Sequence, residues 1–140
     1  MANVRNEERP LSPHATVYKI GPHMLVSFVH RLTGTGLAIG GSLLLIWWLA
    51  ALASGAATYA AFVDVFTVAA GGLNILGYVV GIGLSWLVFQ HMASGVRHLF
   101  LDQGANFELK GNRATAILTF AFSVVATIAF WVVILEKSNG

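Results

Sequence analysis

The sequence predicts an all-α membrane protein with three transmembrane helices in an up-down-up bundle. Of the 140 residues, 56% are hydrophobic and only 10% are charged, whereas charged residues make up about 25% of typical soluble domains. The charges also leave three long gaps, which run from Arg31 to Asp64, from Asp64 to Arg97, and from Arg113 to Glu136. Each gap exceeds the roughly 20 residues that a helix needs to cross the hydrocarbon core of a bilayer.

The first predicted helix covers residues 24–52 and follows a polar N-terminal segment, residues 1–23. Pro10 and Pro13 favour an extended or turning chain in this segment, and Gly21-Pro22 indicates a break directly before the helix. Residues 2–9 lack the basic start, short apolar run and small-residue cleavage site of a signal peptide. We therefore expect the first helix to be retained.

The second and third predicted helices cover residues 73–101 and 114–135, and residues 136–140 form a short tail. Together the three helices make one transmembrane domain, residues 24–135. Gly36 and Gly40, and likewise Gly77 and Gly81, have the small-x-x-x-small spacing that lets transmembrane backbones approach closely. This spacing supports a packed bundle, which could include a partner chain.

Composition restricts the cofactors and partners. The chain has no cysteine, which excludes a disulfide framework, an iron–sulfur cluster held by this chain and thioether-linked haem. Any cofactor must therefore be held by histidine or oxygen ligands. The net charge of +2 comes without a basic cluster, so nucleic acid is not expected as a partner.

The distribution of lysine and arginine predicts the orientation. These residues lie before or at the start of the first helix and around the second connection, whereas the first connection, residues 53–72, has neither. By the positive-inside rule, the N-terminus and the second connection face the cytoplasm or a mitochondrial matrix. Ser27, His30 and Arg31 then share one membrane layer with the segment from His91 to Asp102. On the opposite side an aromatic belt is expected from Trp47, Trp48, Tyr59 and Trp131.

The segment from His91 to Asp102 carries the strongest functional signal. At 100° per residue, His91, His98 and Asp102 share a narrow helix face, with Gly95 beside them. An ionisable side chain in hydrocarbon is costly without a partner, and a neutral imidazole binds iron, so His91 is a candidate axial ligand of a haem. The alternatives are a hydrogen bond to a neighbouring helix for His91 and contact with water for His98.

Basic side chains near the same membrane boundary suit the anionic propionates of a haem. His30, Arg31 and His98 are available at that level. Asp102 lies near the end of the same helix, where a carboxylate opposes the helix dipole. We expect either a helix-ending turn, or an ion pair with an arginine or a partner chain; the candidates are Arg97 and Arg113 in this chain.

Ser27 and Arg31 form a second constellation. They lie one helical turn apart, so their side chains can face the same small molecule. A quinone carbonyl needs hydrogen-bond donors while negative charge builds on reduction, and a hydroxyl with a guanidinium supplies both. The alternatives are that Arg31 snorkels toward the surface and that Ser27 bonds its own backbone. The pair with His30 beside it favours a quinone site.

Two motifs, in order and at matching spacing, identify a family. The first combines the run from Arg9 to His14 with Ser27-Phe-Val-His30-Arg31-Leu-Thr33-Gly34, and the second is His91-x-x-x-Gly95-x-Arg97-His98-x-x-x-Asp102. With these motifs the chain closely resembles the cytochrome b556 subunits of succinate dehydrogenase, the membrane anchors of respiratory complex II. The resemblance covers most of the chain, and the third helix matches only in length and apolarity.

The resemblance implies a multi-pass subunit of the bacterial inner membrane or the mitochondrial inner membrane. It implies that His91 is an axial ligand of haem b, with the other ligand from a second small membrane-anchor subunit. It places His30, Arg31 and His98 around the haem propionates, and Ser27 and Arg31 at the ubiquinone site. Electrons from succinate would reach ubiquinone through a flavoprotein subunit and an iron–sulfur subunit, and this chain alone is not expected to oxidise succinate.

Three other interpretations stay open on the sequence. A stand-alone membrane cytochrome b, with one haem or two, could take its haem ligands from this chain; His30 and His91 are the candidates because they share a depth. A fumarate reductase anchor would run the same chemistry in the opposite direction, which sequence does not determine because direction depends on cofactor potentials and quinone type. A non-catalytic anchor could keep these residues for assembly only.

Overall fold

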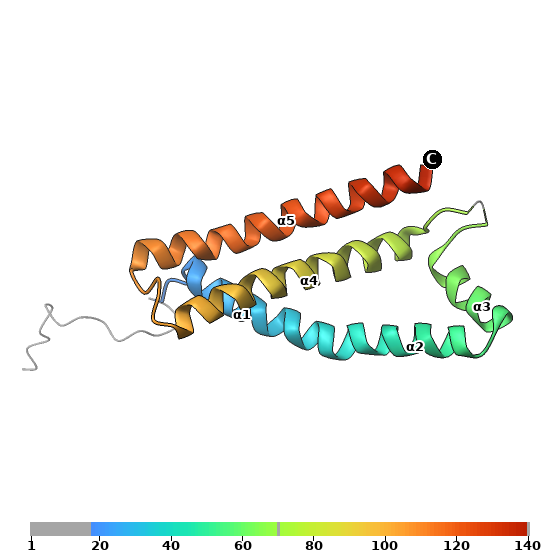
Figure 1. Cartoon of the computed structure of the whole chain (residues 1–140), viewed down its shortest axis with the longest axis horizontal. Coiled ribbons are helices and arrows are strands. Elements are labelled where there is room, and N and C mark those ends of the chain that lie inside the picture. Colours follow the sequence, from blue (N-terminus) through green and yellow to red (C-terminus); the bar gives the residue numbers. More distant parts are fainter. Residues whose placement is uncertain (1–17, 70, 140) are drawn as a thin grey trace, which may run out of the picture.

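The chain is helical almost throughout (Figure 1), in a computed structural model that describes residues 18–69 and 71–139. Within these residues no strand forms, and one isolated bridge joins Thr67 to Leu73. In chain order the elements are α1 (Pro22–Gly36), a π-helical segment η1 (Leu37–Gly41), α2 (Ser42–Ala53), α3 (Ala56–Phe66), α4 (Ile75–Asp102) and α5 (Leu109–Asn139).

Three stretches are long and apolar enough to cross a membrane, namely Pro22–Ala53, Ile75–Asp102 and Leu109–Ser138. They confirm the predicted fold class, an all-α membrane protein with three spanning helices. Figure 1 shows them as long rods of alternating direction, with α4 between α5 and α2, and with α1 crossing α4 and beginning beside α5. Helix α4 contacts α1, α3 and α5, and α1 and α5 also contact each other.

The structure adds helical residues that the sequence prediction left out. Residues 53–72 were expected to be a connection, but they contain α3, which has 11 residues and is too short to span a bilayer. The third spanning helix was expected over residues 114–135, yet α5 begins at Leu109 and continues through residues predicted as a tail. The prediction followed apolar residues alone, whereas Lys, Arg and Glu at the membrane boundary are also good helix formers.

The first spanning helix contains a wide turn. At its start, Pro22 occupies the first helical position, where a missing N–H costs nothing. At η1, the Ser42 N–H donates to the Leu37 carbonyl five residues earlier, which is the π-helical pattern. Such an insertion turns the following residues relative to the preceding face. Consequently α1 packs against α4 and α5, whereas α2 packs against α3.

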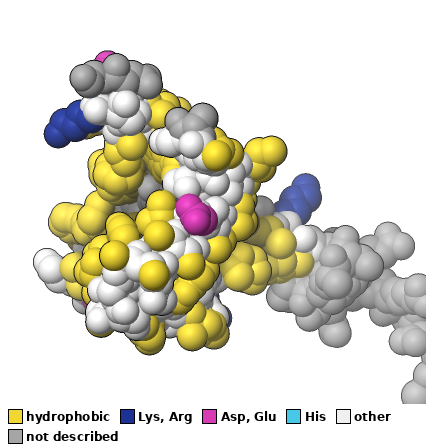
Figure 2. Space-filling model, turned by 90° about the vertical axis from the view of Figure 1, so that its right-hand side faces the viewer, with side chains coloured by type: hydrophobic (Ala, Val, Ile, Leu, Met, Phe, Trp, Pro, Cys, Tyr) yellow, Lys and Arg dark blue, Asp and Glu magenta, His cyan; other side chains and the backbone are white. Residues whose placement is uncertain are grey.

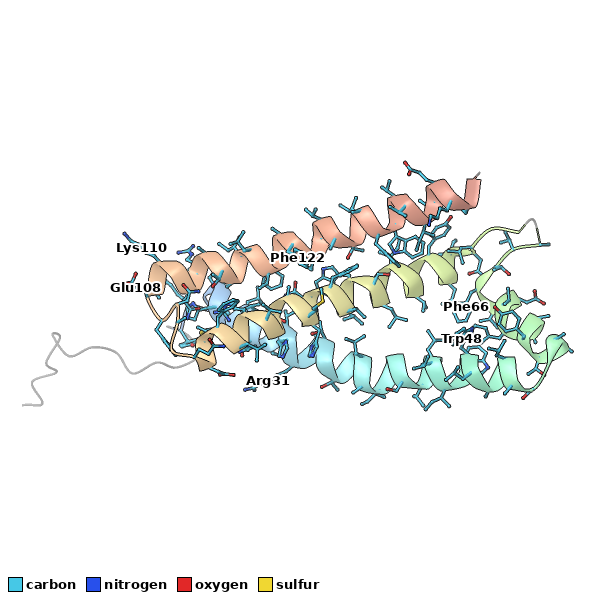
Figure 3. The ribbon with its side chains drawn as sticks, in the orientation of Figure 1. Arg31, Trp48, Phe66, Glu108, Lys110 and Phe122 are labelled. Atoms are coloured by element: carbon cyan, nitrogen blue, oxygen red, sulfur yellow. The ribbon has the colours of Figure 1, made fainter. Side chains whose placement is uncertain are left out.

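Aromatic side chains gather at the end of the bundle that holds α3, here called the aromatic end. The Trp47 ring lies 4.7 Å from the Phe62 ring and 5.9 Å from the Phe66 ring, centroid to centroid. Figure 3 shows Phe66 and Trp48 at this end. Asn74 caps α4 by accepting from the Gly77 N–H at 2.8 Å, and its amide donates to the Val65 carbonyl at 2.8 Å. These contacts hold α3 against the start of α4.

The bundle has an apolar exterior and a largely polar interior. Seen from the aromatic end, hydrophobic side chains are the commonest coloured type on the described surface, and Lys, Arg, Asp and Glu are few (Figure 2). The buried hydrophobic residues among those described are Val26, Ala51 and Ala116, and the buried polar or charged ones are Thr33, Gln90, Ser94, Arg97, Thr119, Ser123 and Thr127. This is the arrangement expected in a bilayer, where lipid solvates apolar side chains and polar groups must find partners inside the protein.

A hydrogen bond between α4 and α5 fixes the centre of this interior. The Ser123 hydroxyl, which has one proton to donate, lies 2.7 Å from Oε1 of Gln90 and 2.9 Å from the carbonyl oxygen of Phe120, and the shorter distance favours Gln90 as its acceptor. Both side chains are fully buried. The amide nitrogen of Gln90 has no hydrogen-bond partner within the described residues. Gln90 therefore depends on Ser123 for its side-chain hydrogen bond in the described part of the chain.

Replacing Ser123 by alanine is expected to destabilise the bundle by about 1–2 kcal/mol, because it leaves the buried carbonyl of Gln90 without a donor. The thermal midpoint of the detergent-solubilised protein, followed by circular dichroism, measures this. Ser138→Ala on the same helix is the matched control, since the Ser138 hydroxyl is exposed and bonds its own backbone. Equal midpoints for the two variants would contradict the assignment of the bond.

Candidate functional site

Three histidines from two spanning helices meet in the seam between α1 and α4. The rings of His30 and His91 are stacked, with centroids 4.1 Å apart and planes inclined by 6°. The His98 ring lies 4.9 Å from the His30 ring at an angle of 54°. Residues 61 positions apart in the chain are thus in direct contact. The seam therefore brings together His91 with two of the three residues expected around the haem propionates, His30 and His98.

The hydrogen bonds of His91 determine which of its nitrogens is available. Its Nδ1 lies 3.2 Å from the carbonyl oxygen of His30 and 3.1 Å from the hydroxyl of Thr33. A carbonyl only accepts hydrogen bonds, so Nδ1 carries the proton. The Thr33 hydroxyl itself donates to the same carbonyl at 3.0 Å. In this arrangement Nε2 of His91 keeps its lone pair, which is the state that a metal ligand requires.

His30 is fixed from the opposite helix. Its Nδ1 lies 2.7 Å from the hydroxyl of Ser94, which is fully buried on α4. The Ser94 hydroxyl donates to the Gln90 carbonyl at 2.6 Å, so it accepts from Nδ1–H of His30. The two histidines are therefore held reciprocally: each helix supplies one ring and the acceptor for the other ring.

Glycines make room for the rings. A Cβ atom added to Gly34 would lie 2.8 Å from Cε1 of His91, which is closer than real contacts allow. A Cβ atom added to Gly95 would lie 3.6 Å from Cε1 of His30, which is an ordinary contact. The absence of a side chain is thus essential at Gly34, on the helix opposite His91, and less critical at Gly95.

Ser27 and Arg31 lie outside the histidine seam. Both are on α1, where Ser27 is partly buried and Arg31 is exposed. Figure 3 shows Arg31 pointing away from the helices. Because the described part of the chain leaves this side of α1 uncovered, these residues are accessible to a molecule or subunit outside the bundle. The structure thus separates the expected quinone residues from the histidines by their position around α1.

The end of α4 has the geometry of a helix-ending turn, which is one of the two expectations for Asp102. The Gly104 N–H donates to the Leu101 carbonyl at 2.9 Å, and the Ala105 N–H to the Phe100 carbonyl at 3.1 Å. Gly104 has a φ of +78°, as is typical of the residue that ends a helix. Asp102 itself is exposed. The geometry favours a helix-ending turn at this position.

Arg97 forms hydrogen bonds with Thr115 and Asn112, and not with Asp102, which was considered as its partner on the sequence. It is buried, with 6% of its surface exposed, and contacts α5. Its Nε donates to the hydroxyl of Thr115 at 3.3 Å, and a terminal nitrogen donates to Oδ1 of Asn112. Sequence reasoning missed these two acceptors, because single polar residues near the start of a helix resemble ordinary boundary residues.

The chain is similar to a known protein family over most of its length. The family described as "succinate dehydrogenase/fumarate reductase transmembrane subunit" matches residues 5–130. The chain belongs to this family. The match includes both motifs and all three spanning stretches except the last residues of α5, so the resemblance seen in the sequence is confirmed.

Individual relatives extend over nearly the same length. The succinate dehydrogenase cytochrome b556 subunit of Paracoccus denitrificans is 32% identical over 128 residues, which cover 91% of this chain and 93% of the relative. The subunit of the same name from Rickettsia felis is 33% identical over 125 residues, or 89% and 92% of the two chains. The mitochondrial cytochrome b560 subunit of Sus scrofa is 26% identical over 120 residues, or 86% and 68%. This family member is accordingly a multi-pass membrane subunit of the succinate dehydrogenase and fumarate reductase class.

Gly34→Ala is expected to destabilise the bundle by about 1–3 kcal/mol, because the added methyl group overlaps the His91 ring, whose Nδ1 is already fixed. Gly36→Ala is the matched control, since a Cβ there meets only Leu87 at 3.8 Å. Alanine in place of a helical glycine then favours the helix by up to about 1 kcal/mol. Thermal midpoints of the two variants should move in opposite directions, and a shift in the same direction would contradict the packing described.

Proposed function

We propose that this chain is the haem b-binding membrane anchor of a succinate:quinone oxidoreductase and that it helps to form the ubiquinone-reduction site. The observation that carries the proposal is the state of His91. Its Nδ1–H is held by the His30 carbonyl, which leaves Nε2 free in a seam between two membrane helices. Metal-ligating histidines commonly have this arrangement, in which the second nitrogen donates to a carbonyl.

The residues present fit one half of a haem site. His91 would be the axial ligand from this chain. Two axial ligands must present their lone pairs to one iron from opposite sides. The rings of His30 and His91 are instead stacked face to face at 4.1 Å, which leaves no space for a porphyrin between them. This supports a second ligand from another membrane-anchor subunit over a stand-alone cytochrome with both ligands in this chain.

Three basic residues are proposed to hold the haem propionates, two inside the histidine seam and one, Arg31, outside it. His98 lies beside His30 in the same seam, and Arg31 follows His30 on α1. In the proposed site His30, His98 and Arg31 would hold the carboxylates, and Ser94 would fix the ring of His30 for that purpose. When bound, haem b would supply single-electron chemistry near the quinone.

Ser27 and Arg31 are proposed as the quinone-binding residues. They lie one turn apart on the same helix, and Arg31 points away from the bundle into the space that a partner subunit and a quinone would occupy (Figure 3). The Ser27 hydroxyl would donate to a quinone carbonyl, and the guanidinium would stabilise the negative charge that develops on reduction. Their roles are therefore to orient the ring and to favour its reduced form.

The charge distribution supports the orientation of the proposed subunit. Lysines and arginines gather at the start of α1, the end of α4 and the start of α5, here called the basic end; Figure 3 shows Lys110 there. By the positive-inside rule this end faces the cytoplasm or the mitochondrial matrix. Quinone reduction would occur there because iron–sulfur and flavoprotein subunits, as soluble proteins, would dock on this side. This chain alone would then not oxidise succinate.

The reverse reaction is the second candidate function. The family description covers succinate dehydrogenase and fumarate reductase alike. An anchor that binds quinol would use the same serine, arginine and histidines, since the direction depends on the potentials of the cofactors and the quinone. A comparison of succinate-dependent quinone reduction with quinol-dependent fumarate reduction by the purified complex distinguishes the two.

His91→Ala is expected to abolish or shift the haem b spectrum of the purified complex, because it removes the imidazole that is proposed to bind the haem iron from this chain. The reduced-minus-oxidised spectrum, normalised to the flavin content, measures the haem. His23→Ala, at the beginning of α1 and outside the seam, is the matched control and should retain the spectrum. An unchanged spectrum in His91→Ala would exclude this residue as the ligand.

Arg31→Leu is expected to lower succinate-to-ubiquinone activity by a factor on the order of 100, as is typical for loss of a charge-stabilising donor. Succinate oxidation with a soluble dye acceptor should change little, because it bypasses the quinone. Arg113→Leu, exposed at the same end of the bundle, is the control. Equal loss of both activities in Arg31→Leu would indicate an assembly role instead.

A further inference from the structure

Arg97 is a buried cation with neutral partners. Only 6% of its surface is exposed, and its described hydrogen bonds go to the hydroxyl of Thr115 and the amide oxygen of Asn112. Among the residues described, no carboxylate forms an ion pair with it. The acidic residues closest in sequence, Asp102 and Glu108, are both exposed, and Figure 3 shows Glu108 at the tip of the bundle, pointing outward. A buried charge without a counter-ion is costly, so an external anion would stabilise this position.

A cleft of about 350 Å³ opens beside the guanidinium, between α4 and α5. At the basic end it is bordered by Arg97, Asn106 and Thr115, and elsewhere its lining is mainly apolar. The positive, hydrogen-bonding end of the cleft thus lies where the phospholipid headgroups of one leaflet would lie, since α4 ends five residues later at Asp102.

An apolar groove continues from this cleft toward the middle of the membrane. A neighbouring cleft of about 300 Å³ shares Ala93, Val96 and Thr119 with the first and extends to Phe122, which Figure 3 shows on the side of α5 that faces α4. From Thr115 to Phe122 the two clefts follow α5 for about 10 Å, at 1.5 Å per residue. One end is cationic and polar and the remainder apolar, which matches the two parts of a phospholipid.

The groove faces away from the histidine seam. At 100° per residue, Val96 lies about 140° and Phe100 about 180° around α4 from His91. The second anchor subunit, if it supplies the other haem ligand as proposed above, would lie on the His91 side. The groove between α4 and α5 would then remain on the face that is open to lipid. The inference that the groove is open to lipid rests on the proposed function, whereas the charge and the shape of the groove do not depend on it.

We propose that the groove between α4 and α5 is a binding site for an anionic phospholipid of the leaflet at the basic end. The phosphate group binds the Arg97 guanidinium, with Asn106 and Thr115 beside it, and one acyl chain lies along Ala93, Val96, Thr119 and Phe122. Basic pockets between membrane helices bind anionic headgroups when, as here, the positive charge lies at the level of the headgroups in the bilayer. The lipid would neutralise Arg97 and join α4 to α5.

Lipid titration of the purified complex tests the proposal. The complex, stripped of lipid in mild detergent, is titrated with dioleoyl phosphatidylglycerol or dioleoyl phosphatidylcholine, and its thermal midpoint and retained lipid are measured. Phosphatidylglycerol should raise the midpoint more than phosphatidylcholine does. Arg97→Gln, which keeps hydrogen-bond donors but removes the charge, should reduce the retained phosphatidylglycerol about five- to ten-fold. The exposed Arg113→Gln should reduce it little.

A second variant keeps the test decisive if Arg97→Gln does not assemble. Ala93→Phe, one helical turn from Arg97, fills the groove but keeps the guanidinium charge, and should also remove the preference for phosphatidylglycerol. Equal effects of the two lipids on the wild-type complex, or retention of phosphatidylglycerol by both variants, would overturn the proposal. Equal stabilisation by inorganic phosphate alone would overturn it too, because that outcome indicates an anion site without an acyl chain. Haem content, followed in parallel, reports separately on the proposed function.

Discussion

The structure depends on one constraint, which is that polar side chains in a hydrocarbon environment must find partners within the protein. Leucine, valine and phenylalanine can face lipid at no cost, so the exterior is apolar. Besides aromatic contacts such as Phe89–Phe130, the spanning helices meet through serine, threonine, glutamine, histidine and arginine side chains. The Gln90–Ser123 bond between α4 and α5 and the His91–His30 bond between α4 and α1 are the clearest examples. Polar pairing thus specifies how the helices meet.

The same constraint makes the helix junctions suitable for chemistry. The seam between α1 and α4 holds imidazoles in one tautomeric state, because each Nδ1 already has its acceptor. The junction of α4 and α5 holds Arg97 against two neutral acceptors. On two different faces of α4, about 120° apart, the bundle therefore presents a lone pair suited to a metal and a positive charge suited to an anion. Helix α4 takes part in both junctions because it contacts both α1 and α5.

The fold was largely predictable, and the site only in part. Long charge-free stretches sufficed for three spanning helices, since a bilayer imposes their length. Helix α3 was missed because it is too short to span a membrane and its aromatic residues pack on α2 only in three dimensions. The sequence placed His30, His91 and His98 in one layer of the membrane, and their rings are in contact in the structure, which is possible only at a shared level. Thr33, Ser94 and Asn112 could not be chosen as their partners, because isolated hydroxyl and amide residues are common in membrane helices.

The sequence by itself determined how many helices cross the membrane, which residues share a depth, and which family the chain resembles. These properties follow from length, charge and spacing along one chain, so they need no knowledge of neighbours. Only the tertiary structure decided which nitrogen of His91 is free, and that Arg97 bonds Asn112 while Asp102 ends its helix at a turn. Those outcomes depend on how far one helix is rotated and shifted along its axis relative to its neighbour. The side chains packed between the two helices determine this rotation and shift, and the residue pattern within a single helix does not contain that information.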